Sequence, residues 1–197
     1  MVFTIGHSNH KVEDFIQILN EYEINCICDV RSVPYSRFTD QFNRENINSA
    51  LLSKNINYIF LGEEFGARRE EKNLLTDGMV DFEKVSKDSK FLDGINRIKK
   101  GMKKGYKIAL MCTEKDPLEC HRTILVSRNL SLIGIECVHI LPDGSLKKHK
   151  EIEQELIEKY FPNRNQICIF DIDEPRDYLS EAYQKANYEI GYRKDGD

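Results

Sequence analysis

Apolar residues follow two patterns along the chain. Short apolar runs predict β-strands, and longer stretches with an apolar residue every three or four positions predict amphipathic α-helices. Strands are expected at residues 2–6, 25–30, 57–61, 106–112, 136–141 and 166–172. Helices are expected at residues 12–22, 43–54, 82–104, 116–133, 145–160 and 175–187. Residues 62–81 are polar and interrupted by glycine, so they are expected to be irregular.

The alternation of strands and helices predicts an α/β fold with a mainly parallel sheet of about five strands. Residues 108–111 are continuously apolar, as in a strand buried on both faces, which predicts a three-layer α/β/α sandwich. Two strand orders remain open, a Rossmann-like 3-2-1-4-5 and a flavodoxin-like 2-1-3-4-5. The first places the tips of strands one and four side by side, where open sheets bind ligands. Residues 1–162 are expected to form one domain. Residues 163–197 are expected to form an extension that packs on the domain or on a partner subunit of a homodimer.

The composition of the chain excludes some classes of function and some cellular locations. The net charge of −4 argues against non-specific nucleic-acid binding, which needs a basic surface. The longest apolar run is too short for a membrane span, and the apolar strand that starts at Val2 leaves no room for a signal peptide. A cytoplasmic protein is therefore expected, with its six cysteines reduced rather than paired. No C-x2-C pair occurs, so a structural zinc ribbon is not expected.

The densest group of reactive side chains follows the fourth strand. An Asp-Pro pair at positions 116 and 117 predicts a helix start there. Cys120, His121 and Arg122 would lie in its first turns and lean back toward Cys112 and Glu114 at the strand tip. A helix N-terminus and neighbouring cations stabilise a thiolate. The plainer alternative is that both cysteines are buried small residues and the histidine belongs to the core.

Polar side chains also follow the first strand. Gly6 permits a tight turn, and Ser8 or Asn9 can cap the next helix, whose free N–H groups form a potential anion site. His7 would face the crevice between the strand tips. The alternative is a capped helix with an incidental histidine.

The tip of the second strand carries Asp29, Arg31, Ser36 and Arg37 on a loop that contains a proline. Arginine is the fork-shaped donor for phosphate and carboxylate groups, so this loop is a candidate for anion or sugar recognition. The alternative is an internal ion pair of Asp29 with Arg31 or Arg37.

Four ordered motifs resemble a prokaryotic family catalogued as a domain of unknown function, number 488. The motifs occupy residues 4–9, 29–37, 58–62 and 112–122, and the resemblance spans about residues 2–145. Residues 63–66 replace a second glycine-rich step that is frequent in the family. The resemblance implies an α/β fold with a site at these motifs, and it implies no reaction.

The first functional hypothesis is an enzyme, a hydrolase or transferase without a cofactor, that acts on a small anionic substrate. A nucleotide, a nucleic-acid end and a sugar phosphate are the substrates considered. The catalytic candidates are side chains that attack, orient or transfer protons: His7, Asp29, Cys112, Glu114 and His121. The substrate-binding candidates are Ser8, Asn9, Arg31, Ser36, Arg37 and Arg122.

Two further hypotheses remain open. Thiolate and imidazole donors suit zinc or iron, and the candidate ligands are Cys112, Cys120, His121 and His7. Adjacent residues of a helix point about 100° apart, which makes joint ligation by Cys120 and His121 awkward. The third hypothesis is a reversible disulfide between Cys112 and Cys120, or a non-catalytic ligand-binding module.

Overall fold

The structure, a computed structural model, describes residues 1–164 and 176–193. These residues form a six-stranded sheet in the order β3-β2-β6-β1-β7-β8, and its first five strands run parallel. They are β1 (Val2–Gly6), β2 (Cys26–Asp29), β3 (Asn57–Phe60), β6 (Ile108–Cys112) and β7 (Cys137–Ile140). The edge strand β8 (Leu146–Lys148) pairs antiparallel with β7. The predicted α/β class with a mainly parallel sheet is confirmed.

Both predicted strand orders are wrong. In order of appearance the parallel strands are arranged 3-2-4-1-5, because β6 lies between β1 and β2. The expected proximity of the first and fourth strand tips is nevertheless present, with Gly6 opposite Cys112. Every residue of both β1 and β6 is buried. Burial identifies such strands as interior but does not tell which neighbour lies on which side, so the pattern could not choose the order.

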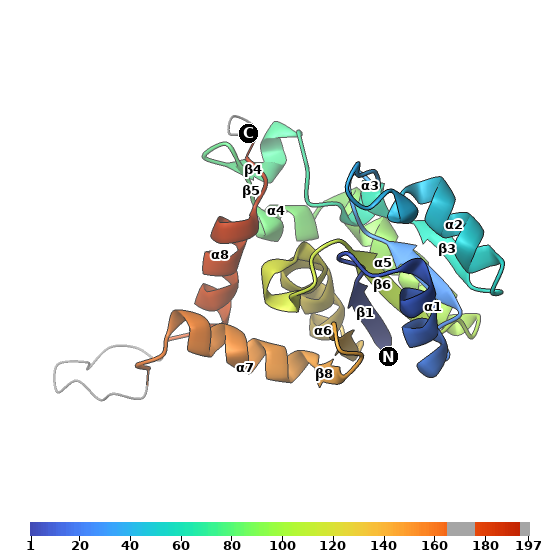
Figure 1. Cartoon of the computed structure of the whole chain (residues 1–197). Helices are drawn as coiled ribbons and strands as arrows, with labels where there is room; N and C mark the ends of the chain where they lie inside the picture. Colours follow the sequence, from blue (N-terminus) through green and yellow to red (C-terminus); the bar gives the residue numbers. More distant parts are fainter. Residues whose placement is uncertain (165–175, 194–197) are drawn as a thin grey trace.

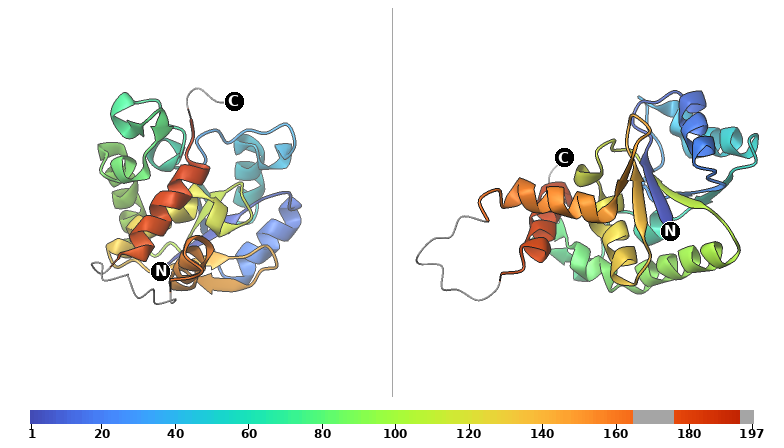
Figure 2. Two further views of the ribbon diagram at one scale, coloured as in Figure 1. Left: turned by 90° about the vertical axis from the view of Figure 1, so that its left-hand side faces the viewer. Right: turned by 90° about the horizontal axis from the view of Figure 1, so that it is seen from below.

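Helices cover both faces of the sheet, giving the predicted three layers (Figures 1 and 2). The side chains of β6 alternate between the faces. Ala109 and Met111 join the core beneath α1 (Val12–Glu21) and α2 (Arg44–Leu52). Ile108, Leu110 and Cys112 belong to the core on the opposite side. That side carries α4 (Phe82–Ser86), α5 (Ser89–Lys103), α6 (Arg128–Leu132), α7 (His149–Tyr160) and α8 (Tyr178–Ile190).

Several predicted elements are divided. The helix expected at 82–104 breaks where the side chain of Asp88 caps α5. The helix expected at 116–133 is a 3₁₀ turn (Pro117–Glu119), a π-helix (Arg122–Ser127) and α6. Residues 62–81, expected to be irregular, contain α3 (Gly62–Phe65), a 3₁₀ turn (Lys72–Leu74) and a hairpin of β4 (Leu75–Thr76) and β5 (Met79–Val80). In the helix expected at 145–160, the first residues form the strand β8, and helix α7 begins only at His149. The strand expected at 166–172 lies outside the described residues. No helix in the described ranges is long and apolar enough to cross a membrane.

The C-terminal helix α8 packs against the rest of the same chain. Tyr183 is buried, and its hydroxyl is 3.1 Å from Nε2 of His149 in α7. The Asn187 side chain accepts from the Phe82 N–H at 2.8 Å and donates to the Val80 carbonyl at 2.9 Å. Beyond the helix, the Val80 N–H donates to the Tyr192 carbonyl at 2.9 Å. These contacts place residues 190–193 beside the carboxyl edge of the sheet.

Two buried histidines connect α8 to the sheet. Thr4 on β1 is hydrogen-bonded to His139 at 2.8 Å, and His139 is hydrogen-bonded to His149 at 3.0 Å. Burial lowers the pKa of His149 to about 4. Burial, followed by the charge of His149, lowers the pKa of His139 as well. Both rings are therefore neutral in the folded protein near neutral pH.

These histidines predict a loss of stability in mild acid. Between pH 6.5 and about 4 the unfolded chain takes up a proton at His149 that the folded protein does not, so the free energy of unfolding falls as the pH falls. The shift corresponds to about 3 kcal/mol for this residue. His149→Gln is expected to flatten the dependence, measured by urea unfolding across this window. His10→Gln, outside the network, should keep the wild-type slope, and an unchanged slope in His149→Gln would contradict the assignment.

Candidate functional site

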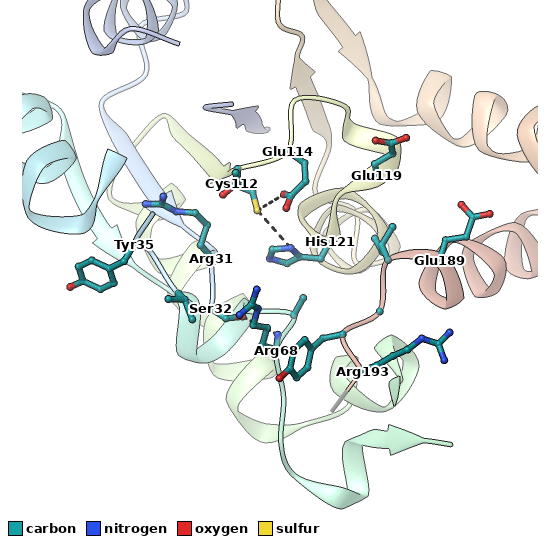
Figure 3. A pocket seen from close by; sticks show the side chains of 16 residues that line it. Arg31, Ser32, Tyr35, Arg68, Cys112, Glu114, Glu119, His121, Glu189 and Arg193 are labelled. Carbon is teal, nitrogen blue, oxygen red and sulfur yellow. Dashed lines mark hydrogen bonds between the residues drawn. The ribbon is translucent and has the colours of Figure 1, made fainter. Parts of the chain in front are cut away.

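A pocket of about 530 Å³ opens at the carboxyl edge of the sheet, beside the tips of β2 and β6 (Figure 3). Its floor contains Cys112, Glu114 and His121. One wall is the loop after β2, which includes Arg31. The remaining wall comes from two distant segments: the loop after α3, with Arg68, and residues 189–193 at the end of α8 and just after it.

Four donor atoms converge on the floor. The Sγ atoms of Cys112 and Cys120 donate to the same carboxylate oxygen of Glu114, at 2.9 and 3.0 Å. Nδ1 of His121 lies 3.7 Å from the Cys112 sulfur, and Nε2 donates to the Val30 carbonyl at 2.9 Å. All four donor atoms lie within 4.8 Å of one another. Both thiols and the imidazole are buried, and Glu114 is an exposed residue whose carboxylate turns inward toward them.

The local backbone explains how adjacent residues reach one centre. Asp116 caps the short 3₁₀ turn by accepting from the Leu118 N–H. The chain then becomes extended at Cys120, with φ −133° and ψ 134°, before the π-helix starts at Arg122. A continuous helix through these residues was predicted, and that prediction is wrong. The 100° divergence expected between Cys120 and His121 therefore does not apply.

The cluster shares its charge unevenly. Burial, and then Cys120, raise the pKa of Cys112 well above its ordinary value. Burial also opposes ionisation of Cys120, but the hydrogen bond with Cys112 and the charge of Arg122 outweigh it and hold the pKa of Cys120 well below the ordinary value. Burial, and then the charge of Cys120, raise the pKa of Glu114. Burial opposes protonation of His121, yet the hydrogen bond with Cys120 raises its pKa overall. Of the two thiols, Cys120 is therefore the one that ionises more easily, and it lies outside the pocket lining.

Two arginines proposed to bind substrate, Arg31 and Arg122, support the loops through hydrogen bonds within the protein. Arg31 makes a two-pronged ion pair with Asp29, at 2.6 and 2.9 Å, and also donates to the Phe42 carbonyl. The internal pair considered as an alternative is therefore present. Arg122 is fully buried and donates to the carbonyls of Glu114 and Lys115. The terminal nitrogens of both guanidinium groups are thus hydrogen-bonded within the protein, whereas Nε of Arg122 is buried without a partner among the described residues. Arg31 still borders the pocket.

His7 lies beneath the site rather than in the pocket. It is fully buried and stacks on Phe42, with 4.2 Å between ring centroids. Its Nδ1 donates to the Ser8 carbonyl, and its Nε2 accepts from Arg31 at 3.0 Å. Burial, and then Arg31, lower its pKa to about 4. The structure therefore does not bring His7 to the other candidate metal ligands.

The remaining polar candidates also lie outside the pocket lining. Lys11, and neither Ser8 nor Asn9, is the N-cap of α1. The backbone N–H of Ser8 donates to the Thr113 carbonyl and so holds the loop after β6. Ser36 anchors its own loop through a 2.7 Å hydrogen bond from its N–H to Asn43, and Arg37 is exposed on that loop.

Sequence reasoning missed several residues of the walls. They are polar or aromatic side chains from four segments: Ser32, Tyr35, Arg68, Glu119, Glu189, Tyr192 and Arg193. Arg68 follows α3 in the segment expected to be irregular, and Arg193 follows α8. No local pattern marks either one, because long-range packing alone brings both segments to the strand tips.

The comparisons with known proteins give one family. A family model described as Domain of unknown function DUF488 matches residues 11–129. The matched region includes the tips of β2 and β6, with the whole floor of the pocket. No curated protein and no solved structure matched the chain.

The close approach of β1 to the floor loop generates a prediction. A Cβ added at Gly6 would lie 1.9 Å from the backbone oxygen of Glu114, and neither backbone can yield easily. Gly6→Ala is therefore expected to lower the free energy of unfolding by about 3 kcal/mol, measured by urea unfolding. At Gly78 nothing lies within 4 Å and only a φ of +77° opposes a side chain, so Gly78→Ala should cost about 1 kcal/mol. Equal losses would contradict the steric argument.

Proposed function

This chain belongs to the family of the domain of unknown function DUF488, and we propose that its pocket is the active site of an enzyme acting on a small anionic substrate. One observation carries the proposal. A single pocket joins a floor of reactive side chains to two arginines of its lining, Arg68 and Arg193, and the guanidinium of Arg68 points toward the floor (Figure 3). Such a combination of convergent polar groups in a concave site is typical of small-molecule sites.

The two wall arginines are the cations available to a ligand. Arg68 is exposed, with its guanidinium 5.4 Å from the ring of Tyr192, and its backbone N–H donates to Ser32 Oγ at 2.9 Å. Arg193 lies over the ring of Tyr188 at 4.8 Å. Within the described residues, no carboxylate forms an ion pair with either one. A guanidinium held at a known place and free of a carboxylate suits a phosphate or carboxylate group.

The other charges of the lining are partly neutralised within the protein. Asp29 neutralises Arg31, and Lys159 pairs with Glu189 at 2.8 Å. The volume of about 530 Å³ falls within the range of about 300–1,000 Å³ found for ligand pockets. A nucleotide, a sugar phosphate or the terminal nucleotide of a nucleic acid fits that size. The Tyr35 and Tyr192 rings in the walls supply flat apolar surfaces for a base or sugar.

The floor is the proposed reaction centre. Cys112, Glu114 and His121 all face the pocket and contact one another. A thiol, a carboxyl group and an imidazole are the side chains that attack, transfer protons or bind metals in hydrolases and transferases. Asp29 and His7 contribute by position: they hold Arg31, and Arg31 forms the wall next to the floor.

The anion site can be tested with three probes: inorganic phosphate, ribose 5-phosphate and AMP. At least one is expected to raise the melting temperature of the wild type and to bind measurably in calorimetry. Arg68→Ala and Arg193→Ala should each weaken that binding about tenfold or more, because each removes a charge-assisted contact. Their melting temperatures without ligand should stay near the wild-type value, since both side chains are exposed.

Lys103→Ala, an exposed cation at the end of α5, is the control and should bind each probe like the wild type. If Arg37→Ala loses binding and Arg68→Ala does not, the anion site lies on the loop after β2, where the sequence analysis expected it. Absence of binding by every probe would contradict an anionic substrate of this size.

A further inference from the structure

We propose that Cys112, Glu114, Cys120 and His121 hold a zinc ion at the floor of the pocket. Their four donor atoms lie within 4.8 Å of one another, and three of these side chains border the pocket. The inference deepens the proposed function and rests on it for the role of the metal in catalysis. The binding of the metal itself rests on the geometry of the cluster alone.

The spacing of the donor atoms suits a tetrahedral ion. With zinc–ligand bonds of about 2.0–2.3 Å, neighbouring donors of a tetrahedron lie about 3.3–3.8 Å apart. The Cys112 sulfur is 3.7 Å from His121 Nδ1, which already fits. Each sulfur is about 3 Å from Glu114 Oε2, so the carboxylate needs to withdraw by only a few tenths of an ångström. Both thiols would release their protons to solvent when the metal binds.

The ring of His121 is oriented as in a metal ligand. Its Nε2–H donates to the Val30 carbonyl at 2.9 Å, which leaves Nδ1 to present a lone pair toward the sulfurs. A ligating histidine almost always donates its other ring N–H to a carbonyl, carboxylate or water, and this contact fixes both tautomer and orientation. Val30 follows β2, so the imidazole is held by a different segment from the one that carries it.

The donor set and its surroundings favour zinc. Two thiolates, an imidazole and a carboxylate are a mixed set of soft and borderline ligands, which zinc accepts in tetrahedral sites. The ion would reduce the formal charge of two thiolates and a carboxylate from −3 to −1. The buried guanidinium of Arg122, which donates to the Glu114 and Lys115 carbonyls, provides a further positive charge beside the cluster. His7 is excluded as a ligand because both of its ring nitrogens are hydrogen-bonded.

Glu114 is the ligand best able to exchange. It is the exposed member of the cluster, whereas the other three are buried. A metal at this place would polarise a substrate oxygen or lower the pKa of a bound water. Arg68 and Arg193 would hold the anionic part of the substrate across the pocket. Cys120 does not border the pocket, so it would act on a substrate through the metal or through the floor residues that it contacts.

The test uses the full chain, expressed without a tag and purified without chelator. Metal analysis and native mass spectrometry are expected to show about one zinc per chain. Cobalt added to the demetallated protein is expected to give the visible bands of a four-coordinate site and a thiolate charge-transfer band. Cys120→Ser should lose stoichiometric zinc, with an affinity at least about a hundredfold lower, and should weaken the charge-transfer band. Cys137→Ser, a buried cysteine of β7 outside the cluster, should keep both signals.

Several results would overturn the proposal: a wild type that binds neither metal, a Cys120→Ser variant that keeps zinc, or a Cys137→Ser variant that loses it equally. If the purified wild type holds iron and Cys120→Ser loses it, zinc is the wrong metal but the proposed metal site is correct. If Cys120→Ser fails to fold, the cobalt spectrum of the wild type decides. Probe binding separates the two proposals. Arg68-dependent binding of AMP or phosphate without metal removes only the zinc site, whereas zinc without binding of any probe removes the proposed substrate.

Discussion

The site depends on β6, whose carboxyl end is held between the ends of β1 and β2. The backbone N–H groups of His7 and Ser8 donate to the carbonyls of Cys112 and Thr113, and the N–H of Val30 donates to the Met111 carbonyl. Gly6 approaches the Glu114 backbone so closely that no side chain fits between them. Backbone hydrogen bonds on both sides therefore fix the strand end that carries the first thiol and the carboxylate. Because β1 and β2 each form a neighbour of β6, residues distant in sequence become parts of one floor.

Buried arginines stabilise this arrangement, and their burial limits what they can do. A buried charge is tolerated only when hydrogen-bond or ion-pair partners surround it. Removing one member of a buried ion pair lowers the free energy of unfolding by about 3–5 kcal/mol. Arg31 has Asp29, Phe42 and His7 as partners, and Arg122 has two loop carbonyls. Their hydrogen bonds are used to hold loops in place. The proposed anion binding is therefore assigned to arginines whose charge remains in contact with solvent, and these lie on the outer walls.

The sequence predicted the class of fold and the floor of the pocket because both follow from local patterns. An all-apolar run such as 108–111 identifies an interior strand, and the polar motif after it identifies a strand tip. The strand order depends on which interior strands pair with each other, and the pattern of apolar residues does not give this information. The convergence of Cys120 and His121 depends on an extended residue between a 3₁₀ turn and a π-helix. Helical periodicity cannot reveal such a break, although π-helical turns are frequent at functional sites.

The outer wall shows how a distant segment can be positioned without a local signal. Residues 190–193 follow a helix that is tied to α7 through Tyr183 and to residues 80–82 through Asn187. The chain Tyr183–His149–His139–Thr4 continues these contacts to β1, the strand whose other end touches the floor loop. Strand β1 therefore contacts the floor loop at its carboxyl end, and through Thr4 in its middle it is linked to the helix that carries the outer wall. Packing against a common strand positions the segment that carries Arg193 relative to the floor cluster. This shared support is the physical reason to treat floor and wall as one site.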